Sequence, residues 1–65
     1  MSRWILKEDL MVGDTIRNYY RDINDEMKFN VEIVKEIKES NILTESGYTL
    51  YGRRYGKRDY FRLND

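Results

Sequence analysis

Short segments in which apolar and polar residues alternate run along much of the chain, and turn-forming residues separate them. Thr15 to Tyr20 (TIRNYY) is rich in β-branched and aromatic side chains, which favour strands. The segment before it, Leu10 to Asp14 (LMVGD), is predicted to be a turn in which Gly13 takes a positive φ. Arg21 to Lys28 (RDINDEMK) is polar and predicts a loop after the first strand.

The second half of the chain continues this pattern. Ile42 to Thr44 and Tyr48 to Tyr51 flank Glu45-Ser46-Gly47, which predicts a tight hairpin with glycine at the turn. Asp59 to Leu63 predicts a last strand. Before these lies a longer extended segment with two predicted faces, Phe29, Val31, Ile33 and Ile37 on one and Asn30, Glu32, Glu36 and Lys38 on the other. Val34 and Lys35 interrupt its alternation.

A helical interpretation competes over residues 15–23 and 30–39. Ile16, Tyr19, Tyr20 and Ile23 are spaced i, i+3, i+4 and i+7, and Ile33, Val34 and Ile37 form a second stripe. Arg53 to Leu63 (RRYGKRDYFRL) resembles the wing of bacterial winged-helix repressors, which implies two helices followed by a basic hairpin in an α+β fold. Such domains also need a recognition helix, and Glu32, Glu36 and Glu39 would place carboxylates where phosphates must approach.

The β interpretation covers more of the chain. A glycine-aspartate turn, a first strand, a polar loop, a long second strand, the hairpin ILTESGYTL and a final strand resemble the SH3-like small β-barrels of many short phage and bacterial proteins, over residues 10–63. The absence of alanine, with six tyrosines and six isoleucines, favours the same class. The fold is therefore predicted to be all-β, a five-stranded SH3-like barrel in one domain of residues 1–65, with the α+β winged-helix arrangement as the alternative.

Length and composition exclude several classes of function. A chain of 65 residues builds one small core and no large enclosed cavity. Cysteine and histidine are absent, which excludes disulfides, thiolate or imidazole metal sites, cysteine nucleophiles and serine-histidine catalysis. Asp22, Asn24, Asp25 and Glu26 crowd oxygen atoms into one loop, but they lack the spacing of a calcium site. The sequence predicts no enzyme, no cofactor, no metal and no small-molecule substrate. Without a signal peptide or an apolar run of spanning length, no membrane association and a cytoplasmic location are expected.

Charge is divided unevenly, although the net charge is zero. Residues 1–46 carry seven Lys and Arg against ten Asp and Glu, and residues 47–65 carry five against two. In the second part, Gly52 to Asp59 (GRRYGKRD) predicts a loop between two strands that displays basic side chains at its tip. Tyr48, Leu50, Phe61 and Leu63 are predicted core residues. The candidate nucleic-acid-binding residues are Arg53, Arg54, Tyr55, Lys57 and Arg58, with Tyr51, Tyr60 and Arg62 as outward neighbours.

The N-terminal apolar residues Trp4, Ile5 and Leu6 allow two interpretations. They either pack against the open end of the barrel, which is the expectation adopted, or form an exposed edge for a partner. The function predicted first is a small binding module for nucleic acid, encoded by a phage or another mobile element. The alternative is a protein-binding regulator or inhibitor of a bacterial host or defence protein, which the small size of the chain and its uneven charge also favour. A homo-oligomer joined through strand edges is a third possibility.

Overall fold

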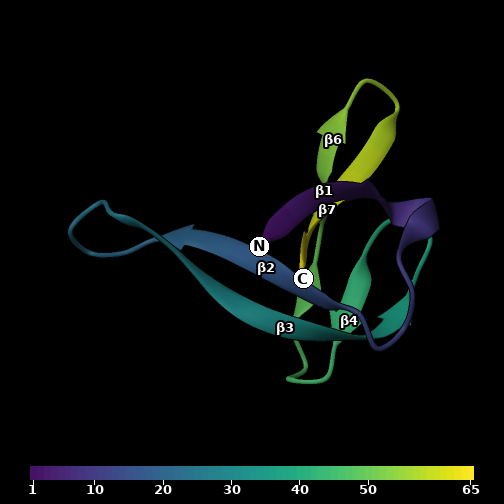
Figure 1. Cartoon of the computed structure of the whole chain (residues 1–65), viewed down its shortest axis with the longest axis horizontal. Coiled ribbons are helices and arrows are strands. Elements are labelled where there is room, and N and C mark those ends of the chain that lie inside the picture. Colours follow the sequence, from purple (N-terminus) through teal and green to yellow (C-terminus); the bar gives the residue numbers. More distant parts are fainter.

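The computed structural model describes all 65 residues, which form an open antiparallel sheet of seven strands. Figure 1 shows their arrangement in the order β1-β7-β2-β3-β4-β5, with β6 paired to β7 away from this path. One three-residue 3-10 helix, η1, is present and no α-helix. The elements are β1 (Ser2–Leu6), η1 (Lys7–Asp9), β2 (Thr15–Arg21), β3 (Met27–Ile37), β4 (Ile42–Thr44), β5 (Thr49–Leu50), β6 (Arg53–Tyr55) and β7 (Arg58–Asn64).

The small core lies on one side of this sheet. Its six buried apolar residues come from β1, the η1–β2 connection, β2, β3, β4 and β7: Ile5, Leu10, Ile16, Val34, Ile42 and Phe61. Ile37, Leu50 and Leu63 pack against them and are partly buried. Only eight residues of the chain are buried in all, so most strand positions remain in contact with solvent. The other side of the sheet therefore carries no packed layer.

Strand β3 changes partners and direction partway along its length. Its first part pairs with β2 and its last residues pair with β4, and the register shifts between Val34 and Glu36. This irregularity adds a residue to β3, which reverses the side to which the following side chains point. Ile37 consequently faces the core opposite Ile42, whereas Ile33 is exposed at 41%. The prediction that Ile37 shares a face with Phe29, Val31 and Ile33 is wrong for this reason.

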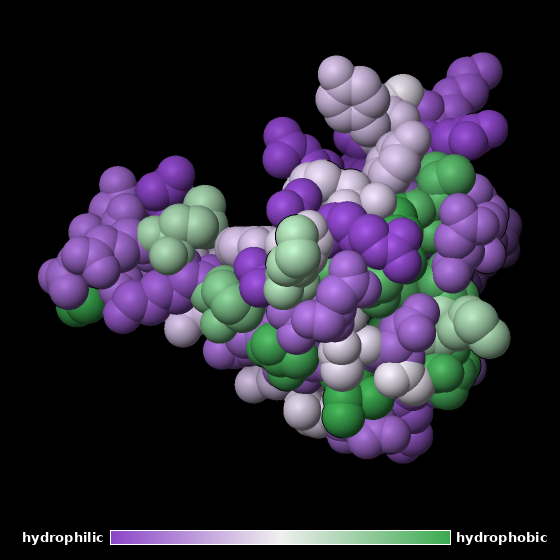
Figure 2. Space-filling view, viewed as in Figure 1, coloured by the Kyte–Doolittle hydropathy of each residue, from purple (hydrophilic) through white to green (hydrophobic).

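Two hairpins project from the body that holds the core (Figure 1). The β2–β3 hairpin is a long twisted arm whose outer residues are almost all exposed, and the β6–β7 hairpin projects on another side. Hydrophilic residues dominate both hairpins, while the hydrophobic surface gathers over the body (Figure 2). The two ends of the chain meet beside β1 and β7, where the amide of Asp65 donates to the carbonyl of Met1 at 2.9 Å.

Several predicted elements are confirmed by this structure. Thr15 to Tyr20 lies within β2, the β4–β5 hairpin turns at Gly47 with φ 91°, and Gly13 takes a φ of 96° in the turn before β2. The helical interpretation of residues 15–23 and 30–39 is wrong, because these segments pair as β2 and β3 over seven positions. The predicted count of five strands was too low, since β1 and β6 were not anticipated.

Three predictions about burial also have an outcome. Phe61 is buried, and Leu50 and Leu63 are partly buried, as expected for core residues. Tyr48 was wrongly placed in the core and is exposed at 56%, because it lies in the turn before β5, whereas Leu50 within β5 is the residue opposite Ile42. The expectation that the N-terminal apolar residues pack inward holds for Ile5, but Trp4 is exposed at 46%.

Candidate functional site

The side of the sheet that faces away from the core carries arginines and aromatic rings in place of a packed layer. Residues directly opposite each other in paired strands share a face, and every second residue along a strand does too. We call this surface the arginine-aromatic face; it consists of the outward residues of β1, β2, β6, β7 and the part of β3 before its register shift. They are Ser2, Trp4, Leu6, Thr15, Arg17, Tyr19, Arg21, Met27, Phe29, Val31, Ile33, Arg53, Tyr55, Arg58, Tyr60, Arg62 and Asn64.

No carboxylate belongs to the arginine-aromatic face. The carboxylates of the same strand segments, Glu32 and Asp59, alternate with face residues and point to the core side. Five arginines lie on the face, and only Arg21 among them forms an ion pair, with Asp25 in the β2–β3 turn. Sequence alternation thus leaves this side of the sheet with positive charges only, whereas the other side carries both signs. The net charge of zero conceals this difference completely.

A row of side chains crosses four strands at the centre of the face. Val31, Arg17, Arg62 and Trp4 are successive partners in β3, β2, β7 and β1. Like charges directly opposite each other in a sheet are unfavourable, so the Arg17–Arg62 pair needs a compensating interaction. Neither guanidinium obtains it from a carboxylate of the chain. The two arginines consequently carry their positive charges on a surface without anions, Arg17 over Phe29 of β3 and Arg62 over Trp4 of β1.

Neutral side chains hold these two guanidinium groups in position. Arg17 Nε donates to Asn64 Oδ1 at 2.8 Å, and Arg62 Nε donates to Ser2 Oγ at 2.9 Å. The Arg62 guanidinium lies 5.3 Å from the centre of the Trp4 ring. Such contacts orient an arginine without neutralising it, which leaves its charge available to an anion.

Two aromatic residues of the β2–β3 hairpin, Tyr19 and Phe29, extend the arginine-aromatic face beyond Arg17. The Arg17 guanidinium lies 4.1 Å from the centre of the Phe29 ring, and the Tyr19 ring packs against Phe29 with centroids 5.4 Å apart. Arg17 Nη1 also donates to the Tyr19 hydroxyl at 3.2 Å. That hydrogen bond, with the positive charges of Arg17 and Arg62, lowers the pKa of the Tyr19 phenol below its ordinary value. The largest cause of this lowering is the local hydrogen bond from Arg17.

At the other end of the face, the β6–β7 hairpin and β1 enclose an open hollow. Its volume is about 310 Å³, and four residues line it: Trp4, Arg53, Tyr55 and Tyr60. Gly52 allows the start of β6 to approach β7, since a Cβ there would lie 2.8 Å from the carbonyl oxygen of Tyr60. Because Arg53 is opposite Tyr60 in the hairpin, it reaches the hollow from the same side of the sheet as the three rings.

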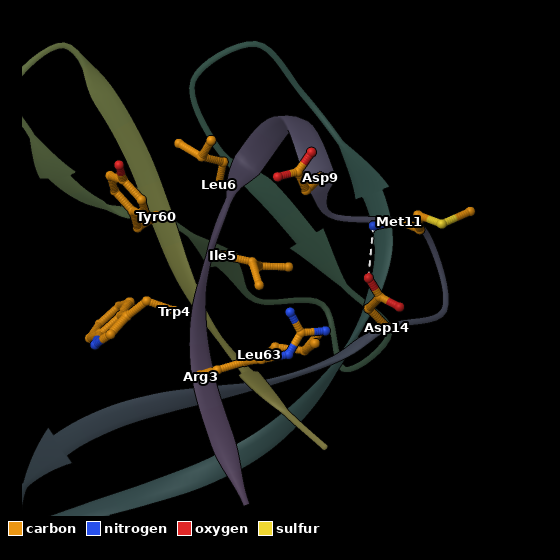
Figure 3. A pocket seen from close by; sticks show the side chains of 9 residues that line it. All are labelled: Arg3, Trp4, Ile5, Leu6, Asp9, Met11, Asp14, Tyr60 and Leu63. Atoms are coloured by element: carbon orange, nitrogen blue, oxygen red, sulfur yellow. Dashed lines mark hydrogen bonds between the residues drawn. The ribbon is translucent and has the colours of Figure 1, made fainter.

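A second, wider hollow of about 620 Å³ runs along the free edge of β1. Figure 3 shows that Trp4 and Tyr60 lie on one side of β1, whereas Ile5 and Arg3 point to the other. Asp9 and Asp14 also line this hollow, and Asp14 accepts a hydrogen bond from the amide of Met11 at 2.8 Å. Its carboxylates make this hollow a poorer place for an anion than the arginine-aromatic face.

The eight residues proposed from the sequence do not form one surface. Arg53, Tyr55, Arg58, Tyr60 and Arg62 belong to the arginine-aromatic face, but Arg54 points to its other side and pairs with Asp59 at 3.2 Å. Lys57 lies in the turn beside Gly56, and Tyr51 lies between β5 and β6, exposed at 72%. The predicted loop from Gly52 to Asp59 is in fact a hairpin of β6 and β7, with a turn of two residues.

The structure adds residues that sequence reasoning did not select. Trp4, Arg17, Tyr19 and Phe29 complete the face from strands β1, β2 and β3. Alternation within Thr15 to Tyr20 already implied that Arg17 and Tyr19 share one side of a strand. Their proximity to Arg62 follows only from the pairing of β2 with β7, which brings together residues 45 positions apart.

The acidic residues after β2 have a structural role in the β2–β3 turn. Asp22 Oδ1 accepts from the amides of Asn24 and Glu26, and its other oxygen pairs with Lys28 at 2.9 Å, so this carboxylate closes the β2–β3 turn. No group of three or more acidic side chains converges as a metal site would require. No helix has the length and apolar character needed to cross a membrane.

Comparison of the chain with protein-family models, with curated proteins and with solved structures found no match.

Proposed function

We propose that this protein binds nucleic acid through the arginine-aromatic face. The observation that carries the proposal is the Arg17–Arg62 pair, two arginines directly opposite each other in paired strands, with no carboxylate to neutralise either guanidinium. A phosphate bound at either guanidinium would supply the missing negative charge and release counterions into solution. Arg53 and Arg58, which form no ion pair, extend the same charge along the β6–β7 hairpin.

The aromatic residues of the face support nucleic acid over other polyanions. Tyr19, Tyr55 and Tyr60 alternate with arginines along β2, β6 and β7. Trp4 and Phe29 lie beneath the guanidinium groups of Arg62 and Arg17, and all five rings are at least partly exposed. Stacking of bases on aromatic rings, beside arginines that contact the backbone, is the arrangement of proteins that bind single strands without sequence preference. A surface for a simple polyanion would need only the arginines.

A pair of charge reversals tests this function. Arg58→Glu changes the arginine-aromatic face, whereas Arg3→Glu makes the same change in net charge on the other side of β1. Binding of a fluorescently labelled oligonucleotide of about 12 nucleotides is measured by anisotropy at 0.1 M salt. We expect Arg58→Glu to weaken binding roughly tenfold or more, because one phosphate contact is lost and one repulsion is added. Arg3→Glu should change it less than threefold by the same estimate. Equal losses, or no binding by the unaltered protein at low salt, would reject the proposal.

A second candidate function, binding of a protein partner, is favoured by the apolar end of the same face. Met27, Phe29, Val31 and Ile33 are exposed at 56%, 41%, 47% and 41% along β3. A bacterial host or defence protein regulated by this chain would contact these residues. Val31→Lys distinguishes the two functions, since it removes apolar contact area and adds a positive charge next to Arg17. Tighter binding of oligonucleotide by this variant would favour the nucleic-acid function, and unchanged or weaker binding would favour a protein partner.

We also propose that the fold is a variant of the SH3-like small barrel. The β2–β3–β4 meander, with its register shift in β3 where the sheet turns around Val34 and Ile42, supports this relationship. Mapping of the contacts between backbone amides of neighbouring strands by NMR would test it. Hydrogen bonds that close the sheet between its two edge strands, β1 and β5, would support a barrel. A flat, open arrangement would contradict it.

A further inference from the structure

We propose that the hollow between β1 and the β6–β7 hairpin receives one unpaired nucleobase, so that the protein selects single strands over duplexes. This inference rests on the proposed nucleic-acid function and names the form of nucleic acid that the face takes. The hollow joins three aromatic rings and one guanidinium: Trp4 from β1, Tyr55 and Arg53 from β6, and Tyr60 from β7.

The size and the walls of the hollow suit a flat, uncharged ring. Its volume of about 310 Å³ is at the lower end of the range of about 300 to 1,000 Å³ for small-molecule sites. Three of its four lining residues offer aromatic surfaces, on which any of the bases can stack. Arg53 supplies hydrogen-bond donors at the wall and forms no ion pair within the chain. A base could therefore stack on a ring while the Arg53 guanidinium contacts the phosphate attached to it.

The charge of the hollow argues against the other ligand that aromatic cages bind. Methylated ammonium groups are held by clusters of aromatic rings through attraction between the cation and the rings. In this hollow Arg53 already places a positive charge among the rings, and no carboxylate lines it. A cation would be repelled by Arg53, whereas a neutral base attached to negative phosphates would be attracted.

Two arginines beside the hollow are placed to contact the phosphates on either side of that base. Arg62 lies over the Trp4 ring at 5.3 Å, and Arg58 is opposite Tyr55 in the hairpin. Both belong to the arginine-aromatic face and neither is ion-paired. In a duplex the bases are stacked and paired inside the double helix, so the hollow could be filled only by a base that is free. Duplex DNA would reach the arginines and leave the rings unused.

The experiment uses Trp4, the only tryptophan of the chain, as the reporter. Three probes of equal length and backbone charge per strand are titrated: an eight-nucleotide single strand, the same strand with its bases replaced by abasic sugars, and the corresponding duplex. Tryptophan quenching and anisotropy are recorded for each. We expect the base-bearing strand to quench Trp4 and to bind more tightly than the abasic strand and the duplex.

Two tyrosine variants make the test specific for the hollow. Tyr55 lines it and is 77% exposed, while Tyr51 is 72% exposed and lies outside it, so neither substitution removes core packing. Tyr55→Ala should weaken binding of the base-bearing strand roughly tenfold and abolish its advantage over the abasic strand. Tyr55→Phe should bind the base-bearing strand about as tightly as the unaltered protein does, because the aromatic ring is retained. Tyr51→Ala should change affinity less than twofold by the same reasoning.

The possible failures are distinguishable. Equal binding of base-bearing strand, abasic strand and duplex, still weakened by Arg58→Glu, would overturn the base site and leave the nucleic-acid function standing. Absence of binding to all three probes would overturn both. Quenching of Trp4 by a trimethyl-lysine peptide and not by the single strand would identify the hollow as a cation cage and overturn the base site.

Discussion

Arg53 and Arg54 are adjacent in β6, and their opposite orientations allow a prediction with an internal control. Arg53 lies on the arginine-aromatic face opposite Tyr60, and Arg54 pairs with Asp59 on the other side of the hairpin. Each substitution by alanine removes one positive charge from the same three-residue strand. We expect only Arg53→Ala to reduce the salt dependence of oligonucleotide binding.

The expected magnitude follows from the number of arginines free to contact phosphates. Of the five on the face, Arg21 is paired with Asp25, which leaves Arg17, Arg53, Arg58 and Arg62. Counterion release from a single strand gives a slope of about −0.7 per contact in a plot of log affinity against log salt, hence about −2.8 for four contacts. Affinity should then fall about 50-fold between 0.05 and 0.2 M salt. Arg53→Ala should reduce the slope to about −2.1 and weaken binding about fivefold at 0.1 M salt.

The assay is anisotropy of a labelled single strand at five or six salt concentrations, for the unaltered protein and both variants. Circular dichroism and thermal unfolding serve to confirm that each variant is folded. Arg54→Ala should retain the slope of the unaltered protein, since its charge is already neutralised by Asp59. Identical reductions in slope for both variants would refute the reasoning, because the effect would then depend on net charge and not on the face.

Three further predictions concern the stability of the scaffold. Gly52→Ala should lower the free energy of unfolding by about 1 to 3 kcal/mol, because its Cβ would lie 2.8 Å from the carbonyl oxygen of Tyr60; an unchanged urea midpoint would contradict this. Glu32→Met should raise that free energy by about 1 kcal/mol or more, since Glu32 is 7% exposed and its Oε1 has no hydrogen-bond partner; a less stable variant would show that the carboxylate is needed. Hydrogen bonds from the Glu26 amide and from Lys28 lower the pKa of Asp22 in the folded protein. The ionised Asp22 carboxylate therefore stabilises the fold above the unfolded-state pKa of about 3.9, and this stabilisation is lost as the pH falls through the lower pKa of the folded state. Asp22→Asn should accordingly lower the unfolding temperature at pH 6 and converge with the unaltered protein in acid; a difference that does not depend on pH would exclude the charge as its cause.

Local sequence signals were sufficient to predict the turns at Gly13 and Gly47 and several of the strands. Gly13 and Gly47 mark positions where a positive φ is required, and both turns are found where these residues predict them. The β-branched and aromatic composition of residues 15–20 identified β2 correctly. These features depend on neighbouring residues only, which is why one sequence reveals them.

Features that depend on pairing between distant segments were predicted less well. The polar residues of β6 suggested a loop, and only its pairing with β7 makes it a strand. The interruption at Val34 and Lys35 was visible in the sequence, but its meaning, a register shift that turns Ile37 toward the core, requires the pairing with β4. The candidate site was found in part for the same reason. The cluster of basic residues after Gly52 was evident from the sequence, whereas Arg17 joins it through long-range pairing with Arg62.

The meeting of the two chain ends beside β1 and β7 has a practical consequence for all of these experiments. Because the Asp65 amide is hydrogen-bonded to the Met1 carbonyl, any tag or fused domain at either end emerges from the same place. Ser2 and Asn64 lie there, next to the row that contains Trp4 and Arg62. A bulky fusion would therefore obstruct the access of a ligand to the arginine-aromatic face. Linking the ends with a short glycine spacer and opening the chain at Ser46 would give a circular permutant whose tag is attached in the β4–β5 turn, outside that face.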